Sequence, residues 1–176
     1  DAYNNMGNVL KEKGDLGAAI DSYKQALKIK PNYAEVYNNM GLALNDKGDL
    51  EAAIDSYKRA LKINPDYAEA FNNMGIVLQN KGDLDAAIDS YQQALQINTD
   101  FAEAYNNMGA ALKDKGNFEA AIDSYNQALK IKPDSQASLA GKFYLQSHKC
   151  DWAGLEQDRD LIRLLGTKKE PIGTKN

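Results

Sequence analysis

The sequence contains few of the side chains that most often carry chemistry. It has one cysteine, Cys150, and one histidine, His148, in 176 residues. A single cysteine excludes a disulfide within the chain and is typical of a reducing compartment, so we expect a cytoplasmic location. His148 and Cys150 stand two residues apart, a spacing at which side chains do not face each other on a helix, and a zinc site needs three or four ligands. The sequence therefore predicts no catalytic residue, no metal site and no cofactor.

Charge and hydropathy argue against two classes of partner. The formal net charge is −4, with 21 lysines and arginines against 25 aspartates and glutamates. This surplus of acid argues against a nucleic acid or an anionic membrane as the main partner. No apolar run approaches the ~20 residues of a membrane span, and no secretory signal is visible. Phosphate-binding glycine loops, calcium loops and nucleophile elbows are also missing.

A repeat dominates most of the chain. Residues 34–67 and 68–101 are identical at 22 of 34 positions, and the units 1–33 and 102–135 follow the same pattern. A fixed period of this size indicates one supersecondary unit stacked on copies of itself. The first unit lacks its first residue, so we expect the chain to be a fragment of a longer protein.

Each unit reads as two amphipathic helices joined by a short turn. In the second unit the apolar residues recur at spacings of three and four; they are Tyr37, Met40, Leu44, Leu50, Ala53, Ile54, Tyr57 and Leu61. Gly48 suits a left-handed cap at the end of the first helix, and Asp49 can cap the start of the second. Pro65 stops the second helix. Thr99 replaces this proline in the third unit, so we expect that helix to end less sharply.

Small residues and methionines recur at fixed positions. Gly41 lies inside a predicted helix, where glycine costs roughly 1 kcal/mol relative to alanine. Its recurrence in every unit, as Gly7, Gly75 and Gly109, indicates that two helices approach closely there. All four methionines occupy one repeat position, which predicts core packing rather than a metal or cofactor site.

These residues carry a resemblance to the tetratricopeptide repeat family. The family's pattern of aromatic, small and apolar positions is met in the second unit by Tyr37, Met40, Gly41, Leu44, Ala53, Tyr57, Ala60 and Pro65. The resemblance covers residues 1–135. It implies an all-α, right-handed α-solenoid of four repeats, whose concave face is lined by the first helix of each pair and binds a protein or an extended peptide.

Residues 136–176 leave the repeat period. We expect residues 136–166 to form a degenerate helical cap, with helices from Gln136 to about Ser147 and over residues 152–165, and residues 167–176 to form a flexible tail. The segment 147–152 (Ser-His-Lys-Cys-Asp-Trp) is similar to the junction between repeats and catalytic domain in the O-linked N-acetylglucosamine transferase (SPINDLY-like) family. That similarity implies the substrate-recruiting region of a larger glycosyltransferase-like protein. The alternative is a stand-alone scaffold that forms homo-oligomers through the ends of the solenoid.

The resemblance also implies that repeat positions 2, 5, 6, 9, 12 and 13 face the groove, and we expect the ligand to contact residues at positions 2, 5, 6 and 9. Position 6 holds Asn5, Asn39, Asn73 and Asn107, and position 5 holds Asn4, Asn38, Asn72 and Asn106. Position 2 holds Glu35, Glu69 and Glu103, and position 9 includes Leu42 and Ile76. An amide can bond a peptide backbone whatever its side chains are, and an acidic row favours basic or neutral peptides.

Each groove residue also has a purely structural interpretation. The asparagines could bond the neighbouring helix, the glutamates could stabilise the helix dipole, and the apolar residues could pack between repeats. If the asparagines serve the groove, Asn39→Ala with Asn73→Ala should weaken peptide binding and leave the thermal stability nearly unchanged.

Overall fold

The structure is a computed structural model that describes residues 1–148, and all regular structure in that range is α-helical. The described helices are α1 (Ala2–Glu12), α2 (Leu16–Ile29), α3 (Ala34–Lys47), α4 (Leu50–Ile63), α5 (Ala68–Asn80), α6 (Leu84–Ile97), α7 (Ala102–Asp114), α8 (Phe118–Ile131) and α9 (Gln136–His148). The second cap helix expected over residues 152–165 and the tail expected over residues 167–176 lie outside the described residues.

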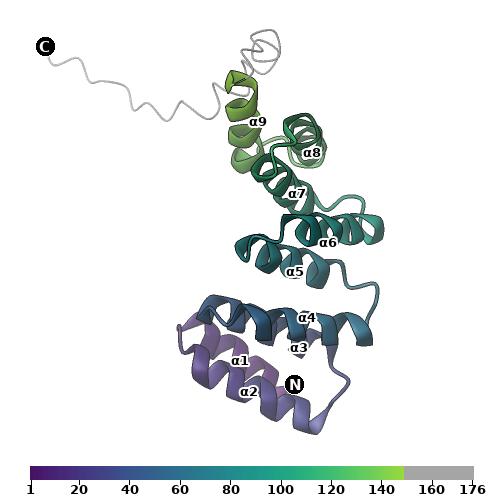
Figure 1. Ribbon diagram of the computed structural model, residues 1–176. Helices are drawn as coiled ribbons and strands as arrows, with labels where there is room; N and C mark the ends of the chain where they lie inside the picture. The colour runs from purple at the N-terminus through teal and green to yellow at the C-terminus, as the bar shows by residue number, and fades with distance from the viewer. Residues whose placement is uncertain (149–176) are drawn as a thin grey trace, which may run out of the picture.

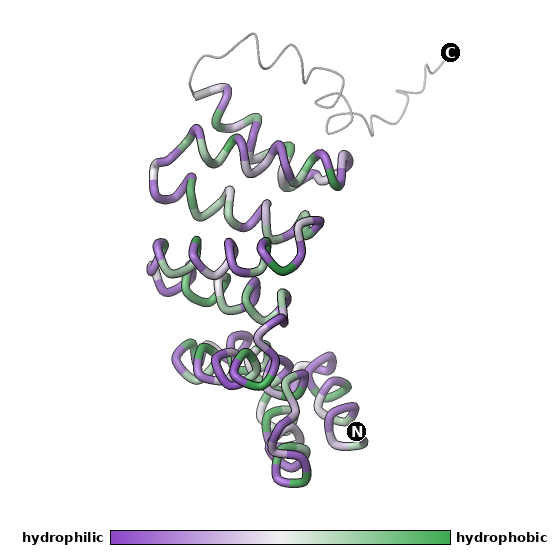
Figure 2. Tube along the Cα trace, turned by 90° about the vertical axis from the view of Figure 1, so that its right-hand side faces the viewer, coloured by the Kyte–Doolittle hydropathy of each residue, from purple (hydrophilic) through white to green (hydrophobic). Residues whose placement is uncertain are grey.

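The helices stack in pairs along one direction, with α1 and α2 at one end and α9 at the other (Figure 1). Each helix contacts its neighbours in sequence, and each odd-numbered helix also contacts the next odd-numbered helix. The even-numbered helices make no such contacts with one another among the described residues. Apolar residues recur along every helix of the stack rather than gathering in one segment (Figure 2). The predicted all-α solenoid is confirmed.

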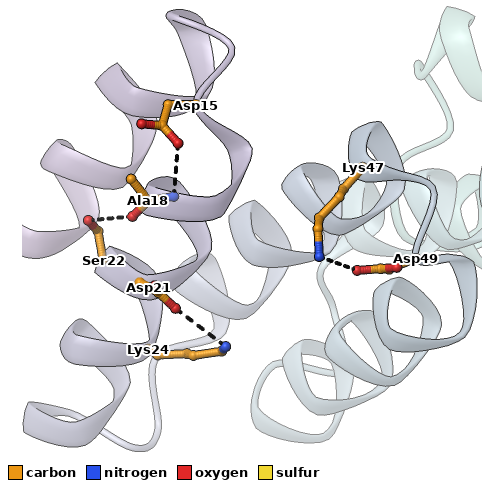
Figure 3. Close-up of polar contacts among 7 residues, drawn as sticks. All are labelled: Asp15, Ala18, Asp21, Ser22, Lys24, Lys47 and Asp49. Atoms are coloured by element: carbon orange, nitrogen blue, oxygen red, sulfur yellow. Dashed lines mark hydrogen bonds and ion pairs between the residues drawn. The ribbon is translucent and has the colours of Figure 1, made fainter.

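The turns inside the pairs contain glycines in the left-handed backbone conformation, as predicted. Gly14, Gly48, Gly82 and Gly116 have φ angles of +81°, +88°, +87° and +84°. Asp15 then caps α2, because its carboxylate accepts a hydrogen bond from the Ala18 N–H at 3.1 Å. Asp49 is the N-cap residue of α4, as predicted, but its carboxylate makes no cap hydrogen bond and instead accepts from Lys47 Nζ at 2.8 Å (Figure 3).

A glycine and a tyrosine join the two helices of each pair. A Cβ atom added to Gly41 would lie 2.6 Å from Cε1 of Tyr57, and one added to Gly75 would lie 2.6 Å from Cε1 of Tyr91. Both tyrosines are completely buried. The recurring glycine therefore lets the tyrosine ring of the second helix rest on the backbone of the first, as the sequence predicted.

The ends of the second helices do not depend on proline. Helix α6 ends at Ile97, before Asn98 and Thr99, just as α4 ends at Ile63 before Asn64 and its proline. Asn98 Oδ1 accepts a hydrogen bond from the Asp100 N–H at 3.1 Å, as Asn64 Oδ1 does from the Asp66 N–H at 3.2 Å. The prediction of a less sharp end at Thr99 is wrong, because the asparagine side chain forms the turn in both units.

Candidate functional site

The two asparagine rows are joined into one ladder across the repeats. Asn39 Nδ2 donates to Asn4 Oδ1 at 3.1 Å. The same bond, at 3.0 Å, runs from Asn73 to Asn38 and from Asn107 to Asn72. Each position-6 amide thus donates to the position-5 amide of the preceding repeat. We call this series of three separate bonds the asparagine ladder.

The two rows differ in their accessibility. At position 5, Asn4, Asn38 and Asn72 are only 2%, 5% and 2% exposed, so these side chains lie between adjacent first helices, whereas Asn106 is half-buried. Asn39 and Asn73, at position 6, are half-buried, and Asn5 is exposed. An amide carries two N–H donors and one oxygen. Each position-6 bond to the preceding repeat uses one donor, which leaves the other donor and the oxygen without a partner among the described residues.

A serine ends the asparagine ladder at α9. Gly141 occupies position 6 of what would be the fifth repeat, so no amide is present there. Ser138 Oγ, one turn earlier on α9, donates to Asn106 Oδ1 at 3.0 Å. Gly141 instead lies against the ring of Tyr125. A Cβ atom added to Gly141 would lie 2.5 Å from Cζ of that ring. Helix α9 therefore continues the stack with altered contacts.

The glutamates of position 2 remain on the surface. Glu35, Glu69 and Glu103 are all exposed, and Glu35 accepts a hydrogen bond from Asn4 Nδ2 at 3.2 Å. Burial raises the pKa of the nearby Tyr67, and the charges of Glu35 and Glu69 raise it further. The acidic row is therefore accessible and lies next to the asparagine ladder.

The apolar groove candidates are half-buried. Ile76 packs against the core cluster that contains Ile88 and Tyr91, so part of its surface is committed to packing within the stack. Leu42 is not part of such a cluster among the described residues. Of the two, only Ile76 is therefore shown to pack against a core cluster.

The tyrosine hydroxyls beneath the first helices differ between repeats, which the sequence pattern did not indicate. Tyr23 donates to Asn8 Oδ1 at 2.8 Å, and Tyr91 donates to Gln79 Oε1 at 3.1 Å. The hydroxyl of Tyr57 is buried and has no partner among the described residues. Its repeat carries leucine at position 9, where the first repeat has Asn8. The sequence feature that could have indicated this difference is the variation at positions 9 and 12, which supply the acceptors Asn8 and Gln79.

Metal-binding and membrane-spanning features are absent from residues 1–148. That part of the chain contains no group of three or more histidine, cysteine, aspartate or glutamate side chains that could hold a metal ion. None of its helices is long and apolar enough to cross a membrane.

Comparisons with known proteins identify the repeats. A model described as TPR repeat matches residues 7–48 and 41–82, and a model described as tetratricopeptide repeat matches residues 66–134. The chain belongs to the tetratricopeptide repeat family. The matched family is a binding repeat rather than a catalytic one, and its members present extended concave surfaces to protein partners. The matched repeats are therefore those of a protein-interaction module.

Solved structures share this fold along most of the chain. A crystal structure of MamA is 31% identical, covers 81% of this chain and 84% of its own, and superposes with a TM-score of 0.75. A second MamA structure is 27% identical over 98% of this chain and 97% of its own, with a TM-score of 0.79. PilF from Pseudomonas aeruginosa, 19% identical over 96% of this chain and 77% of its own, shares the fold with a TM-score of 0.85. A comparison with curated proteins found no match.

Proposed function

We propose that the concave face binds an extended segment of a partner protein and that the position-6 asparagines hold the backbone of that segment. The observation that supports this is the burial and hydrogen bonding of the side chains of Asn39, Asn73 and Asn107. Each is half-buried and fixed by one hydrogen bond to the preceding repeat, and each keeps a donor and an acceptor without a partner among the described residues. A side chain that is already held in place loses less conformational entropy on binding.

The acidic row defines the charge that the segment should carry. Glu35, Glu69 and Glu103 are exposed and lie in the first turns of α3, α5 and α7, the helices that also carry the asparagines. Their carboxylates attract basic side chains and repel acidic ones, which sets specificity more than affinity. A basic or neutral extended peptide therefore fits this face.

Peptide display followed by fluorescence anisotropy tests the proposal. Peptides selected on the wild-type chain are measured against Asn5→Ala and against Asn39→Ala with Asn73→Ala. Asn5 makes no hydrogen bond within residues 1–148 through its side chain, so its replacement removes a groove amide without breaking the asparagine ladder. We expect both variants to weaken binding, Asn5→Ala by about fivefold and the double variant by about thirtyfold, since each lost hydrogen bond contributes ~1 kcal/mol.

The control is a substitution in the buried row. The expectation that Asn39→Ala with Asn73→Ala leaves stability nearly unchanged needs revision, because these changes leave the buried oxygens of Asn4 and Asn38 unpaired. Asn38→Ala breaks the asparagine ladder from the other side and keeps every position-6 amide. At a temperature where all variants are folded, it should bind more tightly than the double variant. Equal binding by the wild type, Asn5→Ala and the double variant would show that the asparagines are structural only.

Two contexts for this binding are proposed. The first is a recruiting region within a larger glycosyltransferase-like protein. Its support is the segment 147–152 alone; the family models that match end at residue 134. Sequencing the transcript beyond the codon for Asn176 tests it, since an open frame encoding a transferase domain supports this context and an immediate stop codon contradicts it.

The second context is a scaffold that assembles through its ends, and an exposed apolar face favours it. Tyr3, Met6 and Val9 lie on one face of α1 and are 44%, 54% and 49% exposed. The equivalent face of α3 is covered by α2, and its Ala43 is completely buried. Sedimentation velocity over a range of concentrations tests this context. Self-association that Met6→Glu abolishes supports it, and a monomer at every concentration contradicts it.

A further inference from the structure

The face formed by the second helices contains a groove that is separate from the concave face. Because the backbones of α2 and α4 do not contact each other, a hollow of about 650 Å³ remains between them. Its floor includes the apolar side chains of Leu27, Met40 and Leu44. We call this hollow the α2–α4 groove. It runs across the junction of the first and second repeats.

The rim of the α2–α4 groove is cationic. Lys24 and Lys28 stand on α2, and Lys47 and Arg59 stand on the opposite side. Figure 3 shows Lys24 on one side and the pair of Lys47 and Asp49 on the other. Asp49 and Asp55 also line the groove, and Asp21 pairs with Lys24 beside it, so four cations stand against three carboxylates. The chain as a whole carries a net charge of −4, which makes this a local reversal.

The arginine extends the positive charge beyond the groove. The guanidinium of Arg59 lies over the ring of Tyr37, with 5.8 Å between its Cζ and the ring centroid. Both residues also line an adjoining hollow of about 650 Å³, where Lys62 adds a further charge. Within the part of the chain that the structure describes, Lys28 and Lys62 make no ion pair, and Lys24 pairs only with the exposed Asp21.

This charge is not a general property of the repeat. The residues two repeats further on that correspond to Lys24, Lys28 and Arg59 are Gln92, Gln96 and Gln127. All six side chains are exposed, so packing does not require either residue type at these positions. The difference between the two junctions is thus confined to the surface.

We propose that the α2–α4 groove binds an acidic segment of a partner protein, with an apolar side chain on the groove floor and carboxylates against Lys24, Lys28 and Arg59. An arginine fork matches the geometry of a carboxylate, and its position over Tyr37 holds it at the rim. The apolar floor distinguishes this partner from a purely polyanionic one. The site lies on a different face from the asparagine ladder and does not depend on the function proposed for that face.

Fluorescence anisotropy with a defined probe tests this site. The probe is a fluorescein-labelled peptide in which two leucines are flanked by aspartates and glutamates. Lys24→Gln with Lys28→Gln and Arg59→Gln should weaken binding about tenfold, since three exposed ion pairs with the probe are lost. Lys115→Gln with Lys130→Gln and Lys132→Gln removes the same charge at the far end and should bind like the wild type.

Two further measurements distinguish binding in the α2–α4 groove from binding on the concave face and from attraction by charge alone. The concave variant Asn39→Ala with Asn73→Ala should bind the acidic probe as the wild type does. A probe with serines in place of its leucines should bind several-fold more weakly. Equal loss in both triple variants would assign the attraction to net charge and overturn the groove, and so would equal binding of the leucine and serine probes.

Discussion

The ring of Tyr57 occupies the space that a side chain on Gly41 would need, since an added Cβ would lie 2.6 Å from Cε1 and 2.7 Å from Cζ. Alanine would gain ~1 kcal/mol from its better helix propensity, but overpacking a core typically costs ~1–3 kcal/mol. Gly41→Ala should therefore lower the free energy of unfolding in urea. Gly17→Ala is the control, because an added Cβ there meets only Asp15 Oδ1 at 3.9 Å. It should leave stability unchanged or raise it.

The tyrosines of the first two repeats should respond differently to the loss of their hydroxyls. Tyr23→Phe removes a hydrogen bond of 2.8 Å to Asn8 and should cost about 1 kcal/mol. Tyr57→Phe removes a buried hydroxyl with no partner among the described residues, so its stability should equal or exceed that of the wild type. Urea unfolding of the two variants side by side measures the difference. Equal losses would show that Tyr57 has a partner, such as a bound water molecule.

Stability should fall in alkali. Burial raises the pKa of Tyr23 and of Tyr125 to about 12, and it also raises the pKa values of Tyr57 and Tyr91. In the unfolded chain a tyrosine ionises near pH ~10. These groups therefore contribute full stability below about pH 10 and lose it as the pH rises through their folded-state values.

Urea midpoints from about pH 8 to about pH 11.5 measure this effect. The wild type should lose stability across the upper part of that range. A variant with phenylalanine at all four positions should lose less over the same interval. Parallel curves would mean that the four tyrosines do not carry the alkaline loss.

The asparagine ladder should show energetic coupling between repeats. Asn73→Ala leaves the buried Asn38 oxygen unpaired, which costs ~1–3 kcal/mol, and Asn38→Ala removes the acceptor of the same bond. The double variant should cost less than the sum of the single changes by ~0.5–1.5 kcal/mol. A double-mutant cycle of unfolding free energies measures this coupling, and strict additivity would contradict the bond.

The proline missing from the third repeat offers a stabilising substitution. Asn98 has φ −127° and ψ 98°, close to the −128° and 93° of Asn64, which precedes Pro65. Thr99→Pro should therefore fit without strain and raise the stability by ~0.4–1 kcal/mol, because it restricts the unfolded chain. Thr99→Ala is the control, which should not stabilise. A lower melting temperature for Thr99→Pro would show that the two joints differ.

The sequence predicted the helix pairs and their turns because each depends on local periodicity and on a glycine at a fixed place. It also predicted the close approach at Gly41, since a costly glycine that recurs needs a packing reason. The different burial of the two asparagine rows could not be predicted in this way. Positions 5 and 6 are adjacent, and only the distance to the next first helix decides that Asn38 is buried beneath it while Asn39 keeps an accessible surface.

Features built from several helices could not be predicted from the sequence either. Asp49 is the N-cap residue of α4, but its carboxylate accepts a hydrogen bond from Lys47, on the preceding helix, in place of a backbone N–H. The α2–α4 groove draws its charges from three helices, so no single repeat displays it. The hydroxyl of Tyr57 has no partner among the described residues. Whether such a hydroxyl is paired depends on the side chain at another position of the same repeat. Such features require the spatial arrangement.

The contacts between successive pairs are unequal on the two sides of the stack. The odd-numbered helices contact one another and share the asparagine ladder, whereas the even-numbered helices within residues 1–148 stand apart. Bending that spreads or closes the even-numbered helices breaks no hydrogen bond between them, while stretching the other side opens the asparagine ladder. The side of the stack formed by the odd-numbered helices should therefore resist deformation more than the side formed by the even-numbered helices. The spacing of the concave amides stays fixed, and the curvature of the stack changes at low cost.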